Sequence, residues 1–512
     1  MLRKVDLFKK ILFSSISGVL LALSFPKTEI SLFAWVAFIP LFFIFEANKA
    51  KQNISFGFLT GFVFWFITIY WLKYVTWFGL IVLCIYLALY FSLFSFLASL
   101  ILKSKKSALF LIPAIWVVLE FIRANIFSGF GWALLGYSQY KNIFIIQFAD
   151  LFGSFAVSFL VMLVNVFIFL LVKGIVLKKA FIPRKQIALV LILFVLVISY
   201  AAFKLESKKS NSFYRLGIIQ GNIAQDKKWD STLSGEIFAK YKRLTLKADN
   251  DDLDLIIWPE TALSFYLNFE ENNIDKVKKL MAGFKKPILA GAIVYKHDDF
   301  YNSALLFNTR KLERYDKMHL VPFGEYIPFR KRLPILENIV NMVMPIEDFK
   351  SGKDYTIFDV GFKFGVLICF EDTLGYLSRN LVKCGAQVLV NITNDAWFMD
   401  SSSPYQHLQA SVFRAIENRT PLVRCANTGV SCFIDKNGMI GSIVKDKQGK
   451  MIFVDGFMSD DVRIDKKQSL TFYNRYPFLF IGFCVLLIIY NFILFSLSYN
   501  RRDGHGNKGN KD

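Results

Sequence analysis

FGVLICFED, residues 364–372, begins with a short apolar run that ends at Cys369. Phe370 and two acidic residues, Glu371 and Asp372, come next. An apolar run of about four to eight residues is typical of a buried β-strand, whereas helices usually need about ten or more. A cysteine at the end of such a strand is most often a buried structural thiol. The significance of Cys369 therefore depends on the sequence around it.

Similar runs, rich in β-branched residues, lie on both sides: FYRLGIIQ (213–220), LDLIIWP (253–259), KPILAGAIVY (286–295) and AQVLVNIT (386–393). Polar stretches with helical spacing separate them, for example DSTLSGEIFAKYKRLTLKA (230–248) and YQHLQASVFRAIENR (405–419). Alternating strand and helix patterns predict a layered α/β domain, which we place at residues 205–472. A domain of this size can bury a core of its own.

The rest of the chain is too apolar for a soluble protein, and 54% of all 512 residues are hydrophobic. A bilayer span needs roughly 20 residues, and apolar runs near that length lie at 11–25, 31–46, 56–72, 79–102, 107–126, 154–172, 187–204 and 475–498. We therefore predict a polytopic α-helical membrane domain of seven transmembrane helices at 1–204, and an eighth at 473–500. The first run is interpreted as a retained helix, because no persuasive signal-peptide cleavage site follows it.

Basic residues flank alternate apolar runs, in clusters at 3–10, 49–51, 103–106, 173–185 and 501–511. Cytoplasmic loops of membrane proteins carry an excess of Lys and Arg, so all five clusters predict the same orientation. Both termini lie inside, the 205–472 domain lies outside, and the polar segment 501–512 is a disordered cytoplasmic tail. This placement explains the net charge of +21 without nucleic acid, for which the sequence shows no binding motif.

The six cysteines include no CxxC pair, and the four histidines are scattered, so the sequence predicts no structural zinc site. Cys425 and Cys432 could form a disulfide outside the cytoplasm. Buried free thiols are the favoured alternative.

Three predicted strand ends carry reactive groups: Glu260 in IIWPETA, Lys317 in YDKMHLVPFGEYIPF, and Cys369. Each residue could be structural on its own, but together the three residues supply the groups that nucleophilic acyl transfer needs. A thiol needs a base to become a thiolate, which Glu260 could provide. The tetrahedral oxyanion needs fixed positive charge and amide donors, which Lys317 and the backbone N–H of Phe370 could provide.

These motifs resemble the carbon–nitrogen hydrolase (nitrilase) superfamily, whose triad is Glu, Lys and Cys in that order and whose fold is an α-β-β-α sandwich. The whole chain resembles the apolipoprotein N-acyltransferase family. The matching stretches are LSFP (23–26), GWALLGYSQ (131–139), QFADLFGSFAVSFL (147–160), IIQGNIAQDKKW (218–229), IIWPET (256–261), KMHLVPFGEYIPF (317–329), CFED (369–372), NITNDAWF (391–398) and QHLQASVFRAIENRTPLVRCANTGVS (406–431).

The resemblance implies that Cys369 is the nucleophile, Glu260 the general base and Lys317 the stabiliser of the oxyanion. The resemblance also implies roles for other residues, and it implies neither a metal nor a cofactor. Glu325 would position the lysine or the incoming amine, Glu371 would be a supporting acid, Trp229 would close over the lipid site, and Asn302 would lie near the pocket. Phe370 stands where the family often has Tyr, and Met399 stands where Gly is expected after NDAWF.

The implied reaction moves an acyl chain from a phospholipid, phosphatidylethanolamine, to a diacylglyceryl-cysteine lipoprotein. It would occur at the periplasmic face of a bacterial inner membrane. Aromatic residues such as Phe398 and Tyr405 could exclude water, or could simply be core residues. Glu120 and Arg123 are three apart on one predicted helix, and a structural pair is favoured there. Two alternatives are a membrane-tethered amidase or nitrilase, and a transporter or lipid-binding protein with an inactive enzyme domain.

Overall fold

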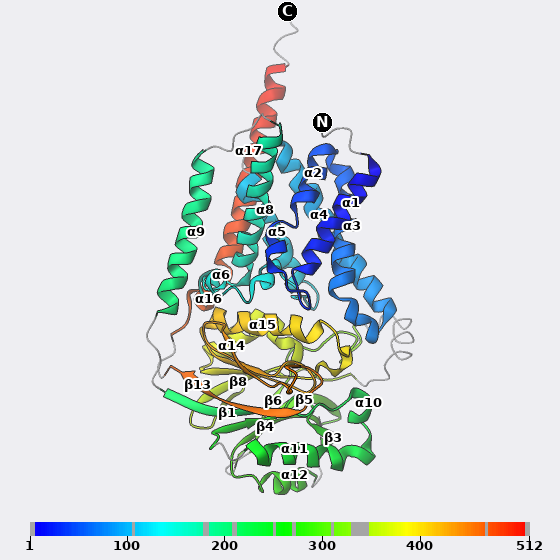
Figure 1. Cartoon of the computed structure of the whole chain (residues 1–512), viewed down its shortest axis with the longest axis vertical. Helices are drawn as coiled ribbons and strands as arrows, with labels where there is room; N and C mark the ends of the chain where they lie inside the picture. Colours follow the sequence, from blue (N-terminus) through cyan, green and yellow to red (C-terminus); the bar gives the residue numbers. More distant parts are fainter. Residues whose placement is uncertain are drawn as a thin grey trace, which may run out of the picture.

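The computed structural model describes residues 6–104, 108–177, 184–206, 212–248, 252–268, 273–308, 312–328, 348–465 and 469–506. Figure 1 shows a bundle of helices at one end and two β-sheets at the other. The bundle contains the helices before residue 206 together with the last helix of the chain. The α/β part is formed by the residues between them.

The principal helices of the bundle follow the predicted apolar runs. They are α1 (Leu7–Leu23), α2 (Ile39–Ala47), α3 (Ala50–Thr68), α4 (Trp77–Ser104), α5 (Ala108–Asn125), α8 (Ser154–Leu177), α9 (Arg184–Leu205) and α17 (Leu479–Gly506). Short helices connect them: η2 (Ser31–Trp35), η3 (Tyr70–Tyr74), η4 (Leu135–Gln139), α6 (Ile143–Ile146), α7 (Ala149–Phe152) and α16 (Phe472–Arg475). Helix α17 extends past the predicted span into segment 501–512, of which residues 507–512 lie outside the described part.

The second predicted span, 31–46, is wrong as a continuous helix, because η2 and α2 are separate. Pro40 lies in the first turn of α2, where its missing N–H does no harm, whereas in a helix interior it would break the hydrogen-bond ladder. Asn165 of α8 compensates for the break: its Oδ1 accepts from Phe38 N at 2.9 Å and its Nδ2 donates to Ala34 O at 2.8 Å. With nine residues, α2 rises about 14 Å, less than the roughly 30 Å hydrocarbon core.

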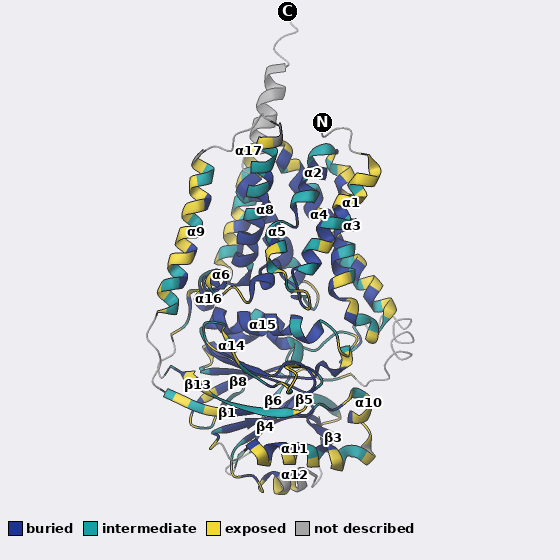
Figure 2. Ribbon diagram, in the orientation of Figure 1, coloured by how far each residue is buried: buried dark blue, intermediate teal, exposed yellow. Residues whose placement is uncertain are grey.

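Several helices have the length and apolar composition that membrane insertion requires. Among the described residues, four stretches are long and apolar enough to cross a bilayer: Trp77–Lys103, Ala108–Asn125, Ser154–Ile175 and Lys185–Leu205. Figure 2 shows that much of α9 is exposed, and its exposed side chains include Leu191, Val195 and Leu196. An exposed apolar face of this kind is expected to contact lipid.

Two sheets face each other in the α/β part. The first contains β13 (Gly456–Ile464), β1 (Ser212–Gln220), β2 (Leu255–Ile257), β4 (Ile288–Lys296), β5 (Asp299–Phe307) and β6 (Leu312–Asp316) in that order, with β3 (Leu263–Asn268) beside β4. The second contains β12 (Ile440–Ile443), β11 (Cys432–Ile434), β10 (Leu422–Ala426), β9 (Val388–Thr393), β8 (Lys363–Ile368) and β7 (Ile357–Asp359). Apolar residues of both sheets, such as Ile218 and Val390, form one buried core.

Helices cover the outer face of each sheet, which completes the predicted α-β-β-α sandwich. The helices α11 (Ser234–Ala248) and α12 (Asn273–Met281) pack on the first sheet. The helices α14 (Gly375–Lys383) and α15 (Ser403–Asn418) cover the second sheet, between it and the bundle (Figure 1). Because α15 lies between two apolar layers, all of its residues except the half-buried Tyr405 are buried.

One side chain of α15 joins the two parts of the molecule. The Oε1 atom of Gln406 accepts hydrogen bonds from Trp71 Nε1 at 2.9 Å and Trp132 Nε1 at 2.8 Å. Its Nε2 donates to Pro26 O at 3.1 Å and Thr68 O at 2.9 Å. These four partners belong to the bundle, so the buried amide fixes how the α/β part sits against it.

Candidate active site

Three loops that follow strands bring the predicted triad together. Glu260 follows β2, Lys317 follows β6, and Cys369 follows β8. Strands β2 and β4 are parallel, while β4–β5 and β5–β6 are antiparallel, so β2 and β6 end at the same edge of their sheet. The facing sheet contributes Cys369 to this edge.

Lys317 and Glu260 lie close together in a buried polar cluster. Lys317 Nζ is 3.9 Å from Glu260 Oε1 and 2.8 Å from both carboxylate oxygens of Glu325. Asn302 Nδ2 donates to Glu260 Oε1 at 2.7 Å and to Glu325 Oε1 at 2.9 Å. Asn302 is therefore in direct contact with the predicted general base.

The ammonium group of Lys317 is stable despite its burial. Only 1% of its side chain is exposed, and burial alone would lower its pKa. The negative charges of Glu325 and Glu260 outweigh burial and raise the pKa above its ordinary value. A fixed positive charge of this kind suits an oxyanion that forms beside it.

Cys369 sits at a strained turn immediately after β8. Its φ is +53°, in the left-handed region that non-glycine residues seldom adopt. Burial, followed by the Glu260 carboxylate, raises the pKa of its thiol, and the Lys317 ammonium only partly offsets these effects. The resting thiol therefore keeps its proton at neutral pH, and attack requires a base.

Glu371 holds the turn of Cys369 against the loop of Lys317. Its Oε1 accepts from Met318 N at 2.7 Å and its Oε2 accepts from Ile368 N at 2.7 Å, while Tyr315 Oη donates to both oxygens. The side chain is fully buried, and burial raises its pKa to about 7. These contacts commit both carboxylate oxygens of Glu371 to the protein, and its predicted supporting role stays a prediction.

A lysine that the sequence did not single out lies beside the triad. Lys228, at the end of α10 (Gln225–Lys228), is 1% exposed, and its Nζ donates to the main-chain oxygen of Glu260 at 2.9 Å. Burial lowers its pKa to about 7, against the opposing effects of Glu260 and Cys369. The next residue, Trp229, is 39% exposed and stacks on Tyr266. Lys228 thus anchors the segment that carries the predicted lid residue.

A group of buried charged side chains beside Cys369 was also not predicted from the sequence. Asp372, Asp395, His407 and Arg424 form a hydrogen-bonded cluster that includes the carbonyl oxygen of Cys369. The signal was present in CFED, NDAWF and the polar residues within the helical pattern at 405–419. Sequence alone could not show that the polar face of this helix is buried as well.

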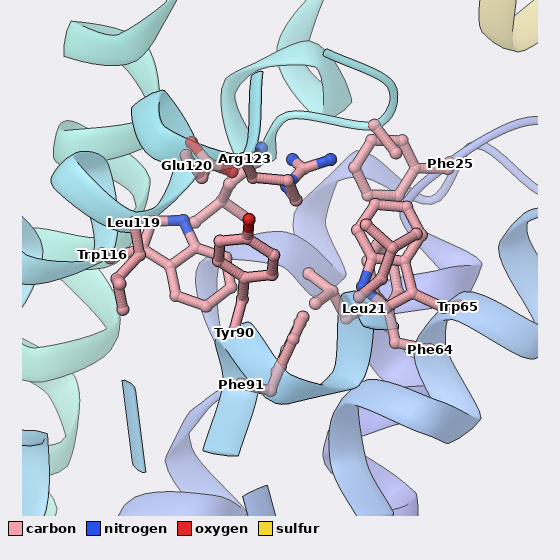
Figure 3. Close-up of a pocket in the computed structure, with 13 residues that line it drawn as sticks. Leu21, Phe25, Phe64, Trp65, Tyr90, Phe91, Trp116, Leu119, Glu120 and Arg123 are labelled. Carbon is pink, nitrogen blue, oxygen red and sulfur yellow. Dashed lines mark hydrogen bonds between the residues drawn. The ribbon is translucent and has the colours of Figure 1, made fainter. Parts of the chain in front are cut away.

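The bundle reaches the site through the loop after α5. Arg123 Nη1 donates to Trp132 O at 2.8 Å, and Glu120 Oε1 accepts from Leu135 N at 2.7 Å. Both side chains line a small cavity of about 20 Å³. Figure 3 shows them at one side of it, with aromatic rings around the rest. The ring of Trp132 stacks on Phe370 with centroids 6.4 Å apart. These contacts favour the structural role of Glu120 and Arg123, since both side chains hold a loop that touches Phe370, the neighbour of the predicted nucleophile.

The predicted water-excluding residues also contact the bundle. Phe398 packs against Trp71 with ring centroids 4.6 Å apart, and Tyr405 belongs to the same apolar cluster.

Among the cysteines, Cys425 and Cys432 are free and buried, which agrees with the favoured alternative to a disulfide.

Met399, which stands where Gly is expected, has a strained backbone conformation. Met399 has φ +51° and ψ −164°, a combination that is almost confined to glycine. Its side chain is 52% exposed.

We therefore expect Met399→Gly to stabilise the protein by about 1 kcal/mol. The substitution relieves about 1–3 kcal/mol of backbone strain, and glycine's extra unfolded-state entropy offsets about 0.5–1 kcal/mol of that gain. Thermal unfolding in detergent measures this. Met399→Ala is the matched control, since it removes the side chain but keeps Cβ, and an equal gain from alanine would contradict the strain argument.

Comparison with known proteins agrees with this geometry. The apolipoprotein N-acyltransferase N-terminal domain model matches residues 17–167, and the carbon-nitrogen hydrolase model matches residues 215–455. A protein of Geobacter metallireducens named apolipoprotein N-acyltransferase is 38% identical over 93% of both chains. The chain belongs to the apolipoprotein N-acyltransferase family.

Other members of this family show similar coverage at lower identity. Apolipoprotein N-acyltransferase 1 of Treponema denticola is 27% identical over 94% of this chain and 95% of its own. The Pasteurella multocida apolipoprotein N-acyltransferase is 31% identical over 86% and 87%, respectively. The predicted family and enzyme class, an acyltransferase with a carbon–nitrogen hydrolase domain, are therefore confirmed. The assignment of individual residues stays a prediction.

Proposed function

We propose that this protein transfers an acyl chain from phosphatidylethanolamine, through a thioester on Cys369, to the N-terminal amine of a diacylglyceryl-cysteine lipoprotein. The arrangement that carries the proposal is the predicted triad, in which the buried Lys317 Nζ lies 3.9 Å from the buried Glu260 Oε1, beside a half-buried, protonated thiol. A base, a fixed cation and a nucleophile in one site are the parts that acyl transfer needs.

In the first half-reaction Glu260 takes the thiol proton and the sulfur attacks the ester carbonyl of the phospholipid. Negative charge develops on the carbonyl oxygen, where the Lys317 ammonium and the Phe370 N–H stabilise it. The tetrahedral intermediate collapses, the C–O bond breaks, and Glu260 returns the proton to the departing alkoxide. Lysophospholipid leaves, and the acyl chain remains as a thioester on Cys369.

In the second half-reaction the neutral α-amine of the lipoprotein attacks the thioester. The same oxyanion contacts apply, and Glu260 accepts the proton that the nitrogen loses. The C–S bond breaks, and that proton returns to the sulfur, which restores the resting thiol. Glu325, which holds both Asn302 and Lys317, keeps the cation in place during both steps.

We also propose that the protein crosses a bacterial inner membrane eight times with the α/β part in the periplasm. Five basic clusters support this orientation. In the eight-span arrangement η2 and α2 together make the second crossing. The membrane orients both lipid substrates, which lowers the entropic part of the barrier. The aromatic contacts of Phe398 and Phe370 with the bundle would exclude water that could hydrolyse the thioester.

Intact-mass analysis after incubation with phosphatidylethanolamine alone tests this function. We expect one acyl adduct that maps to Cys369, that hydroxylamine removes, and that a diacylated lipopeptide discharges into triacylated product. An adduct that water discharges faster than the lipopeptide would support the amidase or nitrilase alternative. If folded protein forms no adduct with any phospholipid, the proposed donor chemistry is wrong.

A further inference from the structure

The carbonyl oxygen of Cys369 is held by two buried side chains. Asn391 Nδ2 donates to it at 3.1 Å, and His407 Nε2 lies 3.2 Å away. Asn391 is on β9 and His407 is on α15, so a strand and a helix converge on this one oxygen. A residue in the left-handed region needs such support, because its conformation costs free energy.

The two donors are themselves fixed by ionised groups. Arg424 Nη1 donates to Asn391 Oδ1 at 2.7 Å, which leaves the amide nitrogen of Asn391 facing Cys369. His407 Nε2 is 2.8 Å from Asp372 Oδ1, and His407 Nδ1 is 3.0 Å from Asp395 Oδ1. Because a carboxylate oxygen accepts hydrogen bonds, both ring nitrogens must carry hydrogen, and His407 is a cation.

The charges of this cluster balance. Arg424 Nη1 and Nη2 reach Asp372 Oδ2 at 3.0 Å and Asp395 Oδ2 at 3.2 Å. The cluster therefore pairs two carboxylates with two cations, and Ser411 Oγ also donates to Asp372. Burial and Arg424 would lower the pKa of His407, but Asp372 and Asp395 raise it to about 9. From the bundle, the uncharged ring of Trp132 faces His407, with ring centroids 5.4 Å apart.

Fixing this carbonyl also fixes the amide on its other side. The Cys369–Phe370 peptide is planar, and in a trans peptide the C=O and N–H bonds point in opposite directions. A carbonyl directed into the charged cluster therefore directs the Phe370 N–H away from that cluster. That N–H is the backbone donor assigned to the oxyanion in the proposed mechanism.

We propose that His407, together with Asn391, is a positioning residue that orients the Cys369–Phe370 peptide so that its N–H points into the oxyanion site. The Asp372–His407–Asp395–Arg424 cluster is then a part of the catalytic machinery that never touches a substrate. The proposal rests on the proposed role of Cys369 as nucleophile.

Two substitutions of His407 separate its two contacts. Gln places its amide near the Nε2 position and can still donate toward Cys369, whereas Asn reaches only the Nδ1 side. Loss of one oxyanion donor lowers kcat by about 10²- to 10³-fold, so we expect about a hundredfold loss for His407→Asn and about a tenfold loss for His407→Gln. The KM for phosphatidylethanolamine should stay within about twofold, because binding does not use the peptide. His297→Gln is the matched control, since His297 is exposed at the β4–β5 turn.

A pH profile separates positioning from simple structural support. The rate of acyl-enzyme formation from phosphatidylethanolamine, measured by quenched mass spectrometry, should fall in the native protein as pH rises through about 9, where His407 loses a proton. His407→Gln has no such proton to lose, so its rate should be lower but should lack this decline. Thermal unfolding verifies that each variant is folded.

The outcomes distinguish this inference from the function on which it rests. If Cys369→Ala still forms the acyl-enzyme, the nucleophile is misassigned and the proposed function fails first. If Cys369→Ala is inactive while folded His407→Asn keeps the native rate, the positioning role is overturned. A His407→Gln variant that keeps the decline near pH 9 also overturns it. Retention of activity by Gln above Asn, with the decline lost, supports it.

Discussion

Cys369→Ala is expected to form no acyl-enzyme, and Glu260→Gln is expected to form it about 10²- to 10⁴-fold more slowly, the usual contribution of a general base. Alanine leaves no atom to carry the acyl chain. Glutamine keeps an oxygen for the hydrogen bond from Asn302 but cannot accept the thiol proton. Because burial raises the pKa of the Cys369 thiol, solvent hydroxide cannot efficiently replace the base at neutral pH.

Single-turnover mass spectrometry with phosphatidylethanolamine measures both rates directly. Cys384→Ala and Glu236→Gln are matched controls, because each makes the same chemical change at an exposed position. Both should acylate Cys369 at the native rate. An acylated Cys369→Ala protein would show that another residue is the nucleophile, and a fully active Glu260→Gln would remove Glu260 from the role of base.

The sandwich could be predicted because its strands are locally consistent. AQVLVNIT has the apolar run and the β-branched residues of a buried strand, and it forms β9 at Val388–Thr393. The second membrane segment was mistaken for one helix because hydropathy records only apolar character. The break between η2 and α2 depends on Asn165, more than a hundred residues away, which satisfies the freed backbone groups.

Residues of the candidate site were predictable only where the residue type and its local sequence indicate a chemical role. A cysteine at a strand end, and a glutamate after a Trp-Pro turn, stand out in the sequence. Lys228 does not, because DKKW reads as an ordinary solvated turn, and only the fold shows that its ammonium is buried against Glu260. His407 is similar: its charge state follows from Asp372 and Asp395, which three separate segments bring together. Such properties belong to tertiary contacts and have no local signature.

Lys317→Met is expected to have an equally severe effect, and to act on both activity and stability. The side chain is 1% exposed and compensates two carboxylates, those of Glu325 at 2.8 Å and Glu260 at 3.9 Å. Removing one partner of a buried ion pair costs about 3–5 kcal/mol, because the remaining charge is left without compensation. Loss of the cation that faces the oxyanion should also lower kcat by about 10³-fold or more.

A second substitution separates these two effects. Glu325→Gln removes one of the negative charges that Lys317 compensates, so the Lys317→Met/Glu325→Gln double variant should recover part of the lost stability. It should recover no activity, because neither methionine nor glutamine supplies positive charge to the oxyanion. Lys317→Arg keeps the charge, but its planar guanidinium cannot reproduce the contacts of a compact ammonium, and we expect it to be nearly inactive.

Thermal unfolding and acyl-enzyme formation, measured on the same preparations, test these expectations. Lys353→Met, at an exposed position, is the control and should match the native protein in both measurements. If the double variant regained stability and activity together, Lys317 would act only by compensating buried charge, and the oxyanion would need another cation. Lys228, whose Nζ donates to the main-chain oxygen of Glu260, is a described alternative. Stability regained without activity would instead assign to Lys317 a role in catalysis that is separate from its role in the fold.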